Sequence, residues 1–365
     1  MSHWDVIVMG AGQAGCAAAW DLAAGGARVL LIHGATAREK PCAGGLTVKA
    51  VRRYRFAIDS VIRESVTDLV LARQGREHHL VNDRAFCVMT HRPELDALCR
   101  ERARQKGADW VTTGGVHALR QDRHGVTLTL REGTRYQADH LIAADGAHSP
   151  IRRLLHGNQD NVVAAVALEA RLPRERARLY PPMTLDFQAV EQGYGWLFPK
   201  GDHINLGLYV WRRDRARPTV TALRDYAQRV LGHAPLEAVA GYPLGTWLVR
   251  RPALCARVLF VGDAAGATEP LLGEGIYGAL VSGQHAAAAL LAGRPQDYPL
   301  LLAGWRDELR QTAVLAKLFY GVRPLGVAAL SRWLGPTLLR GYAQGWTLGQ
   351  TKRAWRGAAL TNPPG

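Results

Sequence analysis

Short apolar runs followed by glycine-rich turns recur along the chain. The first run, WDVIVMG over residues 4–10, is rich in β-branched residues and predicts a buried parallel strand. The turn GAGQAG follows, then an alanine-rich helix that ends at Gly25 and Gly26, and then a second strand over residues 27–33. Together these elements predict a βαβ unit near the N-terminus.

Later segments alternate between strand-like and helix-like patterns. Residues 66–90 and 125–142 alternate apolar and polar positions, and RPELDALCRERARQKGA between them predicts a helix that ends at Gly107. Residues 160–210 predict strands of a second sheet, and from about Tyr277 the pattern is mostly helical. Nucleotide-type strands therefore come at the start, near residue 140 and near residue 260, with β-rich segments inserted between them.

This order predicts an α/β fold, α+β overall, with two closely associated domains in a chain of 365 residues. A Rossmann-like dinucleotide-binding domain is expected to be discontinuous in sequence, with an inserted antiparallel β-sheet substrate domain and a helical C-terminal region. The predicted dinucleotide-binding segments are 1–65, 91–157 and 251–295. The predicted substrate domain takes 66–90 and 158–250, and the helical region takes 296–365.

Charge and cysteine content narrow the partners and the compartment. The chain has 46 Lys and Arg against 31 Asp and Glu, a net charge of +15, which favours an acidic partner protein or an anionic lipid surface. The basic residues form no dense run and no zinc-finger spacing, so nucleic acid is not expected. Five cysteines without a CxxC pair fit a reducing cytoplasm, and no metal site is expected. No segment offers the roughly 18–20 uninterrupted apolar residues needed to span a bilayer.

The first glycine-rich turn has the spacing of a dinucleotide-binding loop. Gly10, Gly12 and Gly15 form G-x-G-x-x-G between a strand and a helix, so backbone N–H groups and the helix dipole can bind phosphate. The acidic residue that usually binds the ribose is replaced at the end of the second strand by His33. A histidine can also bond a ribose hydroxyl, and either Arg38 or Glu39 could assist it.

Two further segments place an aspartate and glycines after apolar strands. HLIAADGAHSPIRR carries Asp145, and VLFVGDAAGATEPLLGEGI carries Gly262 and Asp263. Each aspartate could accept a ribityl hydroxyl, although a helix N-cap is a common alternative role. Pro270, Gly273 and Gly275 then leave bare backbone beside a flat ring and open a helix.

These three segments resemble the FAD-binding motifs of the glutathione-reductase-like flavoproteins with a para-hydroxybenzoate-hydroxylase-type fold. In that superfamily an arginine that opens a helix also contacts FAD, and Arg92 in HRPELDALC matches it. Hydroxylases of the superfamily usually carry a histidine after GDAA, where this chain has Gly266.

Two other segments resemble the geranylgeranyl reductase family. KPCAGGLT is similar to the KPCGGGLS-like segment of that family, and GYGWLFPKGDHINLGL contains its Y-x-W-x-F-P motif. The resemblance extends from residue 3 to about residue 290 and implies FAD as cofactor. It also implies that Cys42, Gly44 and Gly45 lie against the flavin and that Tyr194, Trp196 and Phe198 line a substrate cavity. Cys42 as an inert buried thiol and the three aromatics as ordinary core remain alternatives.

The resemblance implies an oxidoreductase that reduces carbon–carbon double bonds of an isoprenoid or similar apolar substrate by hydride transfer from reduced flavin. Cys42 or an ordered water is a candidate proton donor. The alternative is an FAD-dependent monooxygenase that acts on an aromatic small molecule or on a Trp of a partner protein. A halogenase is a weaker variant of this alternative. A non-enzymatic flavin-binding subunit ranks below the reductase and the monooxygenase.

The reductant and the cellular location are less constrained by the sequence. No second G-x-G-x-x-G is present, so electrons would come from transiently bound NAD(P)H, from a flavin reductase or from a ferredoxin-like donor. The apolar C-terminal region is interrupted by basic residues, which fits either helices over a substrate tunnel or a peripheral contact with the inner face of the membrane.

Overall fold

The structure is a computed structural model that describes residues 3–34, 41–73, 75–157, 162–232, 235–246, 253–330 and 334–361. By its internal contacts the chain divides into two compact units. Unit 1 comprises Met1–Lys40, Pro93–Ala164 and Pro243–Arg310, and unit 2 comprises Pro41–Arg92, Ala165–Tyr242 and Gln311–Gly365. The domain boundaries predicted from the sequence stay a prediction.

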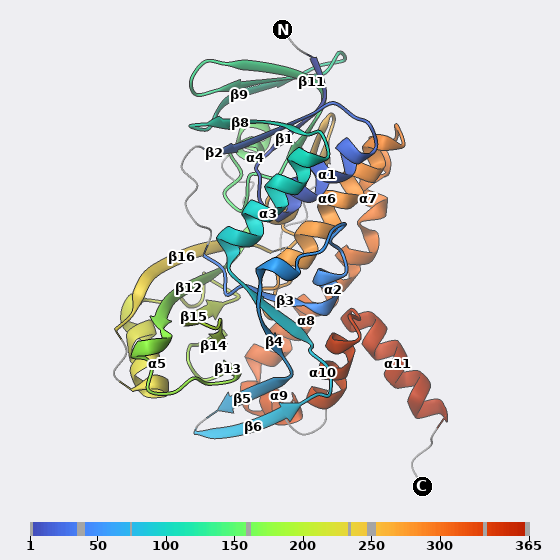
Figure 1. Ribbon diagram of the computed structural model, residues 1–365. Coiled ribbons are helices and arrows are strands. Elements are labelled where there is room, and N and C mark those ends of the chain that lie inside the picture. The colour runs from blue at the N-terminus through green and yellow to red at the C-terminus, as the bar shows by residue number, and fades with distance from the viewer. Residues whose placement is uncertain are drawn as a thin grey trace. The chain divides into compact units, whose positions relative to one another are not determined.

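The core of unit 1 is a parallel sheet built from segments far apart in sequence (Figure 1). Four strands run parallel in the order β18–β11–β1–β2: Val258–Phe260, Arg135–Ala143, His3–Met9 and Val29–Gly34. Strand β8 (Asp109–Thr113) extends this sheet in parallel beside β2. The apolar runs of β1, β2 and β18 are almost entirely buried, as expected for parallel strands covered on both faces.

Antiparallel strands complete the sheet of unit 1. Strand β17 (Leu254–Cys255) pairs with β18, and the hairpin of β9 (Val116–Gln121) and β10 (Val126–Leu130) pairs with β11. Helix α3 (Arg92–Gln105) belongs to unit 1 except for its first residue, which ends the first segment of unit 2. Helices α4 (Pro150–His156) and α7 (Tyr298–Leu301) belong to unit 1.

Helices α1 (Gln13–Ala24) and α6 (Ile276–Leu291) lie side by side in unit 1, as both views of the ribbon show. Small residues permit this approach. A Cβ built on Gly283 of α6 would lie 2.3 Å from the carbonyl oxygen of Ala14 in α1. The two helices therefore meet backbone to backbone at this point.

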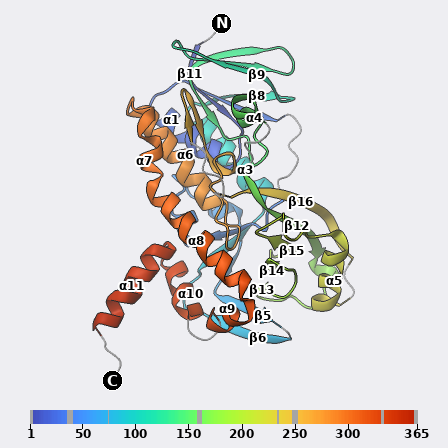
Figure 2. The ribbon, with the colours of Figure 1, turned by 180° about the vertical axis from the view of Figure 1, so that it is seen from behind.

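Unit 2 contains a seven-stranded sheet in the order β16–β12–β15–β14–β13–β5–β6. These strands are Glu237–Gly245, Val163–Pro173, His203–Val210, Gly193–Pro199, Met183–Asp186, Asp68–Arg73 and Arg76–Val81. Helix α5 (Val220–Leu231) packs Leu223 and Tyr226 onto leucines of β12 and β15, and Figure 2 shows it beside these strands. A second sheet joins β3 (Gly45–Thr47), β7 (Cys87–Thr90) and β4 (Ile62–Val66).

The C-terminal part is helical, as its pattern predicts. It consists of α8 (Ala303–Gly321), α9 (Arg323–Ala329), α10 (Gly335–Ala343) and α11 (Leu348–Thr361). Among the helices that the structure describes, none combines the length and apolarity needed to cross a bilayer. The predicted fold class is confirmed: an α/β protein with a discontinuous Rossmann-like part, a largely antiparallel sheet and a helical C-terminal part.

Candidate functional site

The glycine-rich turn of unit 1 requires its glycines. Gly10 has φ +110°, and a Cβ there would lie 2.2 Å from the carbonyl oxygen of Ala144. A Cβ on Gly15 would lie 1.8 Å from the carbonyl oxygen of Gly10. The turn is therefore folded tightly against the end of β11, as a phosphate-binding loop of this type must be.

Both helices at this site begin without a side-chain cap. Helix α1 starts after Gly12 and α6 after Gly275; neither cap residue supplies a side-chain acceptor, and neither first turn contains an acidic residue. Bare N–H groups and a positive dipole end are thus directed out of each helix. These features fit the pyrophosphate and an electron-rich ring of FAD, so the residues present match the group that the sequence predicts.

Asp145, a predicted FAD contact, is held by the start of α4. Its carboxylate accepts hydrogen bonds from Ser149 Oγ at 2.7 Å and from the Ile151 N–H at 2.9 Å. Burial raises the pKa of Asp145 to about 6. Asp145 thus supports the first turn of α4, whose N-cap residue is Ser149, and its contact with a ribityl hydroxyl stays a prediction.

The third predicted segment forms a compact loop between β18 and α6. Asp263 accepts a hydrogen bond from Thr268 Oγ1 at 2.6 Å, and Gly262 and Gly273 have φ +57° and +74°. The carboxylate of Glu269 bonds the N–H groups of Leu271 and Leu272, which fixes the loop around the buried Pro270. The loop presents backbone at the N-terminus of α6, as the sequence predicts.

Arg152 connects two of these segments. It is 2% exposed, donates from Nε to the carbonyl oxygen of Ala264 at 2.8 Å, and its guanidinium lies 4.0 Å from the centre of the Phe260 ring. The sequence alone predicted no role for this arginine. Its position shows that it joins α4 to the loop that follows β18.

His33 and Arg92, the other predicted FAD residues, have defined positions. His33 stacks on Trp110 with ring centres 5.0 Å apart, and burial lowers the pKa of His33. Arg92 is buried at the first position of α3. Arg38 and Glu39 lie outside the described residues. Contacts of His33 and Arg92 with FAD stay predictions.

In unit 2, Cys42 belongs to a buried polar network that we call the Cys42 cluster: Cys42, Thr90, Glu169, Lys200 and Asn205. The Cys42 N–H donates to Glu169 Oε1 at 2.9 Å. The Gly44 N–H donates to Cys42 Sγ at 3.4 Å, which orients the thiol sulfur toward the following turn. Cys42 itself is partly exposed.

Lys200 and Thr90 complete the hydrogen-bond network around Gly44. The carbonyl oxygen of Gly44 accepts from the Thr90 N–H at 2.9 Å and from Thr90 Oγ1 at 3.1 Å, while Lys200 Nζ donates to the Thr90 carbonyl oxygen. Gly44 has φ +71°, and a Cβ there would lie 1.9 Å from Lys200 Nζ. It would also lie 2.2 Å from the Thr90 carbonyl oxygen, which cannot move aside as a lysine can, so a glycine is required here.

The cluster buries two groups that ordinarily carry opposite charges. Lys200 is 2% exposed and Glu169 is 8% exposed. Burial lowers the pKa of Lys200 to about 8 and raises the pKa of Glu169. Shifted titratable groups beside a partly exposed thiol are typical of functional sites.

The three predicted aromatic residues form one buried row that is connected to this cluster. Tyr194, Trp196 and Phe198 follow one another along β14, with neighbouring ring centres 6.2 and 6.3 Å apart. Trp196 Nε1 donates to Asn205 Oδ1 at 2.7 Å, and Asn205 also bonds Glu169. A substrate cavity along this row stays a prediction.

Glycines make room for the aromatic row. A Cβ on Gly207 would lie 2.2 Å from the Trp196 ring, and a Cβ on Gly45 would lie 3.2 Å from the Phe198 ring. Gly45 therefore contacts the row while Gly44 contacts Lys200. The Cys-Ala-Gly-Gly segment and the Y-x-W-x-F-P motif, which the sequence analysis treated separately, meet within unit 2.

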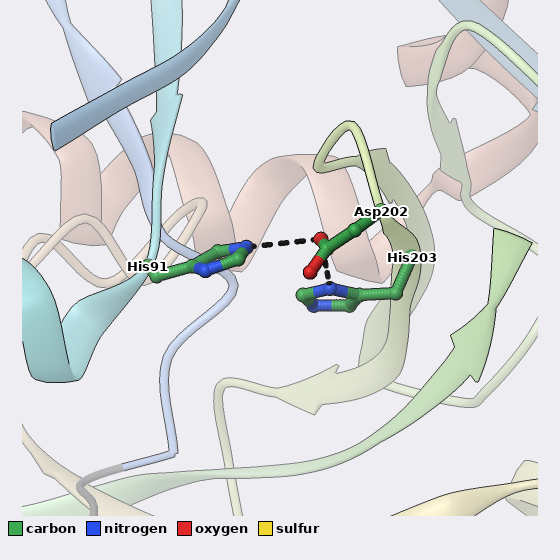
Figure 3. Close-up of side chains that lie close together, drawn as sticks. All are labelled: His91, Asp202 and His203. Atoms are coloured by element: carbon green, nitrogen blue, oxygen red, sulfur yellow. Dashed lines mark hydrogen bonds and ion pairs between the residues drawn. The ribbon is translucent and has the colours of Figure 1, made fainter.

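A carboxylate shared by two imidazoles lies at the turn after Lys200 (Figure 3). Asp202 Oδ1 is 3.2 Å from His91 Nε2 and 2.7 Å from His203 Nδ1, and the ligand atoms of the three residues lie within 4.8 Å of one another. That spacing could accommodate a metal ion. Because Asp202 already contacts both rings, we interpret the group as a network of polar contacts that joins the turn to the end of β7.

Four residues of the cluster were not predicted from the sequence: Thr90, Glu169, Lys200 and Asn205. Glu169 and Asn205 each stand within a strand that is otherwise mainly apolar, β12 and β15. Lys200 directly follows β14, all of whose residues are buried. A charged or amide side chain at such a position is the signal that could have identified them, because burial of an unpaired polar group is costly.

Comparison with known proteins identifies the family. An FAD binding domain matches residues 3–170. Menaquinone reductase of Mycobacterium tuberculosis is 32% identical over 78% of this chain and 76% of its own length. Geranylgeranyl diphosphate reductase of Rhodobacter capsulatus is 28% identical over 84% of this chain and 80% of its own length.

A solved structure shares the fold. A geranylgeranyl bacteriochlorophyll reductase-like protein from Thermoplasma acidophilum superposes with a TM-score of 0.70 at 22% identity, over 94% of this chain and 92% of that one. The relatives match over most of their length, and the glycine-rich loop fits the cofactor that the matched domain binds. The chain is therefore an FAD-dependent oxidoreductase that belongs to the geranylgeranyl reductase family, together with menaquinone reductase.

Proposed function

We propose that this oxidoreductase reduces a carbon–carbon double bond in a polyprenyl chain. FAD, when bound and reduced, supplies the hydride for one alkene carbon, and Cys42 gives its thiol proton to the other. The observation that carries the proposal is the Cys42 cluster, in which a partly exposed thiol is oriented by Gly44 and surrounded by buried Lys200 and Glu169.

The names of the relatives support this substrate class. Geranylgeranyl diphosphate and menaquinone differ in their polar ends, a diphosphate and a naphthoquinone, but both carry a polyprenyl chain. The buried aromatic row beside the cluster supplies apolar surface of the kind such a chain prefers. The glycine at position 266, where hydroxylases of this fold usually carry histidine, also favours reduction over oxygenation.

The test is anaerobic turnover with defined lipids. Dithionite-reduced enzyme is mixed with a geranylgeranyl lipid or with menaquinone, and flavin reoxidation is followed together with the mass of the lipid. We expect a gain of two hydrogens in the polyprenyl chain, located there by fragmentation in the mass spectrum, per reoxidised flavin in the wild type. In Cys42→Ala we expect loss of this turnover by more than about a hundredfold, the scale of a lost acid–base group. Cys255→Ser, at the other partly exposed cysteine, is the matched control. In a parallel run under ¹⁸O₂, incorporation of labelled oxygen into a product would refute the reductase.

We further propose a peripheral contact with the membrane through α8. Val314 and Leu318 of α8, and Val322 just after its end, recur every four residues and are 59%, 59% and 53% exposed, next to the exposed Lys317. An apolar stripe beside a cation is the pattern of a helix that lies at a lipid interface. In flotation with anionic liposomes we expect the wild type to rise with the vesicles and the double variant Val314→Asp/Leu318→Asp to remain in the bottom fraction. A wild type that does not float would contradict this contact.

A further inference from the structure

The Cys42 cluster contains two buried ionisable side chains besides the thiol that is the proposed proton donor. Lys200 and Glu169 are both nearly inaccessible, whereas lysine and glutamate are rarely buried fully. The protein retains this charge beside one particular thiol.

Gly44 brings the ammonium and the thiol to the same residue. Its N–H donates to Cys42 Sγ at 3.4 Å, and the position of its absent Cβ lies 1.9 Å from Lys200 Nζ. Covalent bonds of the backbone are about 1.5 Å long. The Cys42 sulfur and the Lys200 nitrogen therefore both lie close to the Gly44 Cα. The Lys200 ammonium donates a hydrogen bond to the Thr90 carbonyl oxygen, which fixes its position.

The surroundings of Lys200 leave its side chain protonated at neutral pH but able to give up that proton. The titratable and charged groups that face it are Cys42, Glu169, Arg171, Cys87 and His203. Burial lowers the pKa of Lys200 to about 8, while Cys42 and Glu169 favour the ammonium. At neutral pH the side chain is thus mostly protonated, yet it releases a proton far more readily than an exposed lysine does.

We propose that Lys200 is a positioning residue that stabilises the Cys42 thiolate and returns a proton to it. The inference rests on the proposed function. When the thiol protonates the alkene carbon, the S–H bond breaks and its electron pair stays on sulfur. An N–H bond of Lys200 then breaks to restore S–H, and the neutral amine takes up a proton from water. The two electrons for the alkene arrive as hydride from FAD that a cellular reductant, such as NAD(P)H, has reduced.

Two variants separate the two parts of this role. Lys200→Met removes both the charge and the proton. Lys200→Arg keeps the charge, but its guanidinium does not deprotonate in proteins. Lys49→Met is the matched control, because Lys49 is the other buried lysine of the described part of unit 2 and lies outside the cluster. All are made in the Cys255→Ser background.

The first readout is alkylation of Cys42 by iodoacetamide from pH 6 to 9, measured on the Cys42 peptide by mass spectrometry. We expect Lys200→Met to react about tenfold more slowly near pH 7, because removal of a neighbouring cation disfavours the reactive thiolate. Lys200→Arg and Lys49→Met are expected to follow the wild type. An unchanged profile in folded Lys200→Met would overturn the proposal.

The second readout is the time course of alkene reduction. The first turnover uses the proton already on Cys42, so we expect both Lys200 variants to show a burst of one equivalent followed by slower turnover. Lys200→Arg keeps this test available should Lys200→Met fold poorly. Later turnovers as fast as the first would overturn the return of the proton. A wild type that reduces no polyprenyl lipid would refute the proposed function, whereas the alkylation comparison would still decide whether Lys200 acts on Cys42.

Discussion

Replacing Gly44 by alanine tests the geometry on which the Cys42 cluster depends. The new Cβ would lie 1.9 Å from Lys200 Nζ and 2.2 Å from the Thr90 carbonyl oxygen. The lysine can move, but the carbonyl belongs to the backbone of β7. The loop must therefore separate from Thr90 and weaken both hydrogen bonds that the Gly44 carbonyl oxygen accepts.

Two contributions set the size of the effect. An alanine in the left-handed region costs about 1–2 kcal/mol, and φ at Gly44 is +71°. Loss of two hydrogen bonds adds about 1 kcal/mol each. We expect Gly44→Ala to lower the free energy of unfolding by about 3–4 kcal/mol.

Gly75 offers a matched control in the same unit. Its φ is +70°, but a Cβ there would meet nothing within 4 Å. Gly75→Ala should therefore show only the cost of the backbone conformation. The excess for Gly44→Ala, about 2 kcal/mol, corresponds to a melting temperature lower by about 4–8 °C in a domain of 150–250 residues. Calorimetry of both variants measures it, and equal melting temperatures would refute the close approach of Thr90 and Lys200 to Gly44.

Three other predictions address the remaining parts of the site. Gly10→Ala should abolish flavin binding, measured by absorbance near 450 nm, because its Cβ would strike the Ala144 carbonyl. Gly26→Ala (φ +86°, open space) should retain flavin, and a yellow Gly10→Ala protein would contradict this. In flavin-free protein, folding raises the pKa of Asp145 from 3.8 to about 6. The stability that the protonated carboxyl contributes is therefore complete below pH 4 and is lost as pH rises through 6. The loss amounts to about 3 kcal/mol in the free energy of unfolding. Asp145→Asn should flatten that part of the melting-temperature profile, and an unchanged slope would be evidence against burial of the carboxylate. Trp196→Phe should cost about 1–3 kcal/mol in urea unfolding because it leaves the Asn205 oxygen without its donor; a neutral effect would count against that bond.

The FAD-binding part could be predicted from sequence because its constraints are local. Gly10 and Gly15 are needed by a turn only a few residues long, so their spacing is visible in the chain itself. The short apolar run of β18 before Gly262 is likewise visible in the sequence alone. Such patterns identify the loop without any knowledge of the partner strands.

The Cys42 cluster could not be predicted in this way, because its members come from separate strands. Glu169, Asn205 and Lys200 become neighbours only through the register of β12, β15 and β14, where Glu169 is opposite Gly207. Single-sequence patterns do not encode that pairing. The sequence also predicted Asp145 as a cofactor contact, but the N-cap alternative could be assessed only once Ser149 and Ile151 were seen to bond it.

The discontinuous sheet of unit 1 has a consequence for the order of events during synthesis. Strand β1 forms near the N-terminus, but β18 and α6, which complete the sheet and pack on α1, come some 250 residues later. A growing chain that has not yet reached Leu291 has the glycine-rich turn but lacks the helix whose Gly283 contacts Ala14. Because domains fold as units once their segments are available, FAD is expected to bind late, after most of the polypeptide has been made.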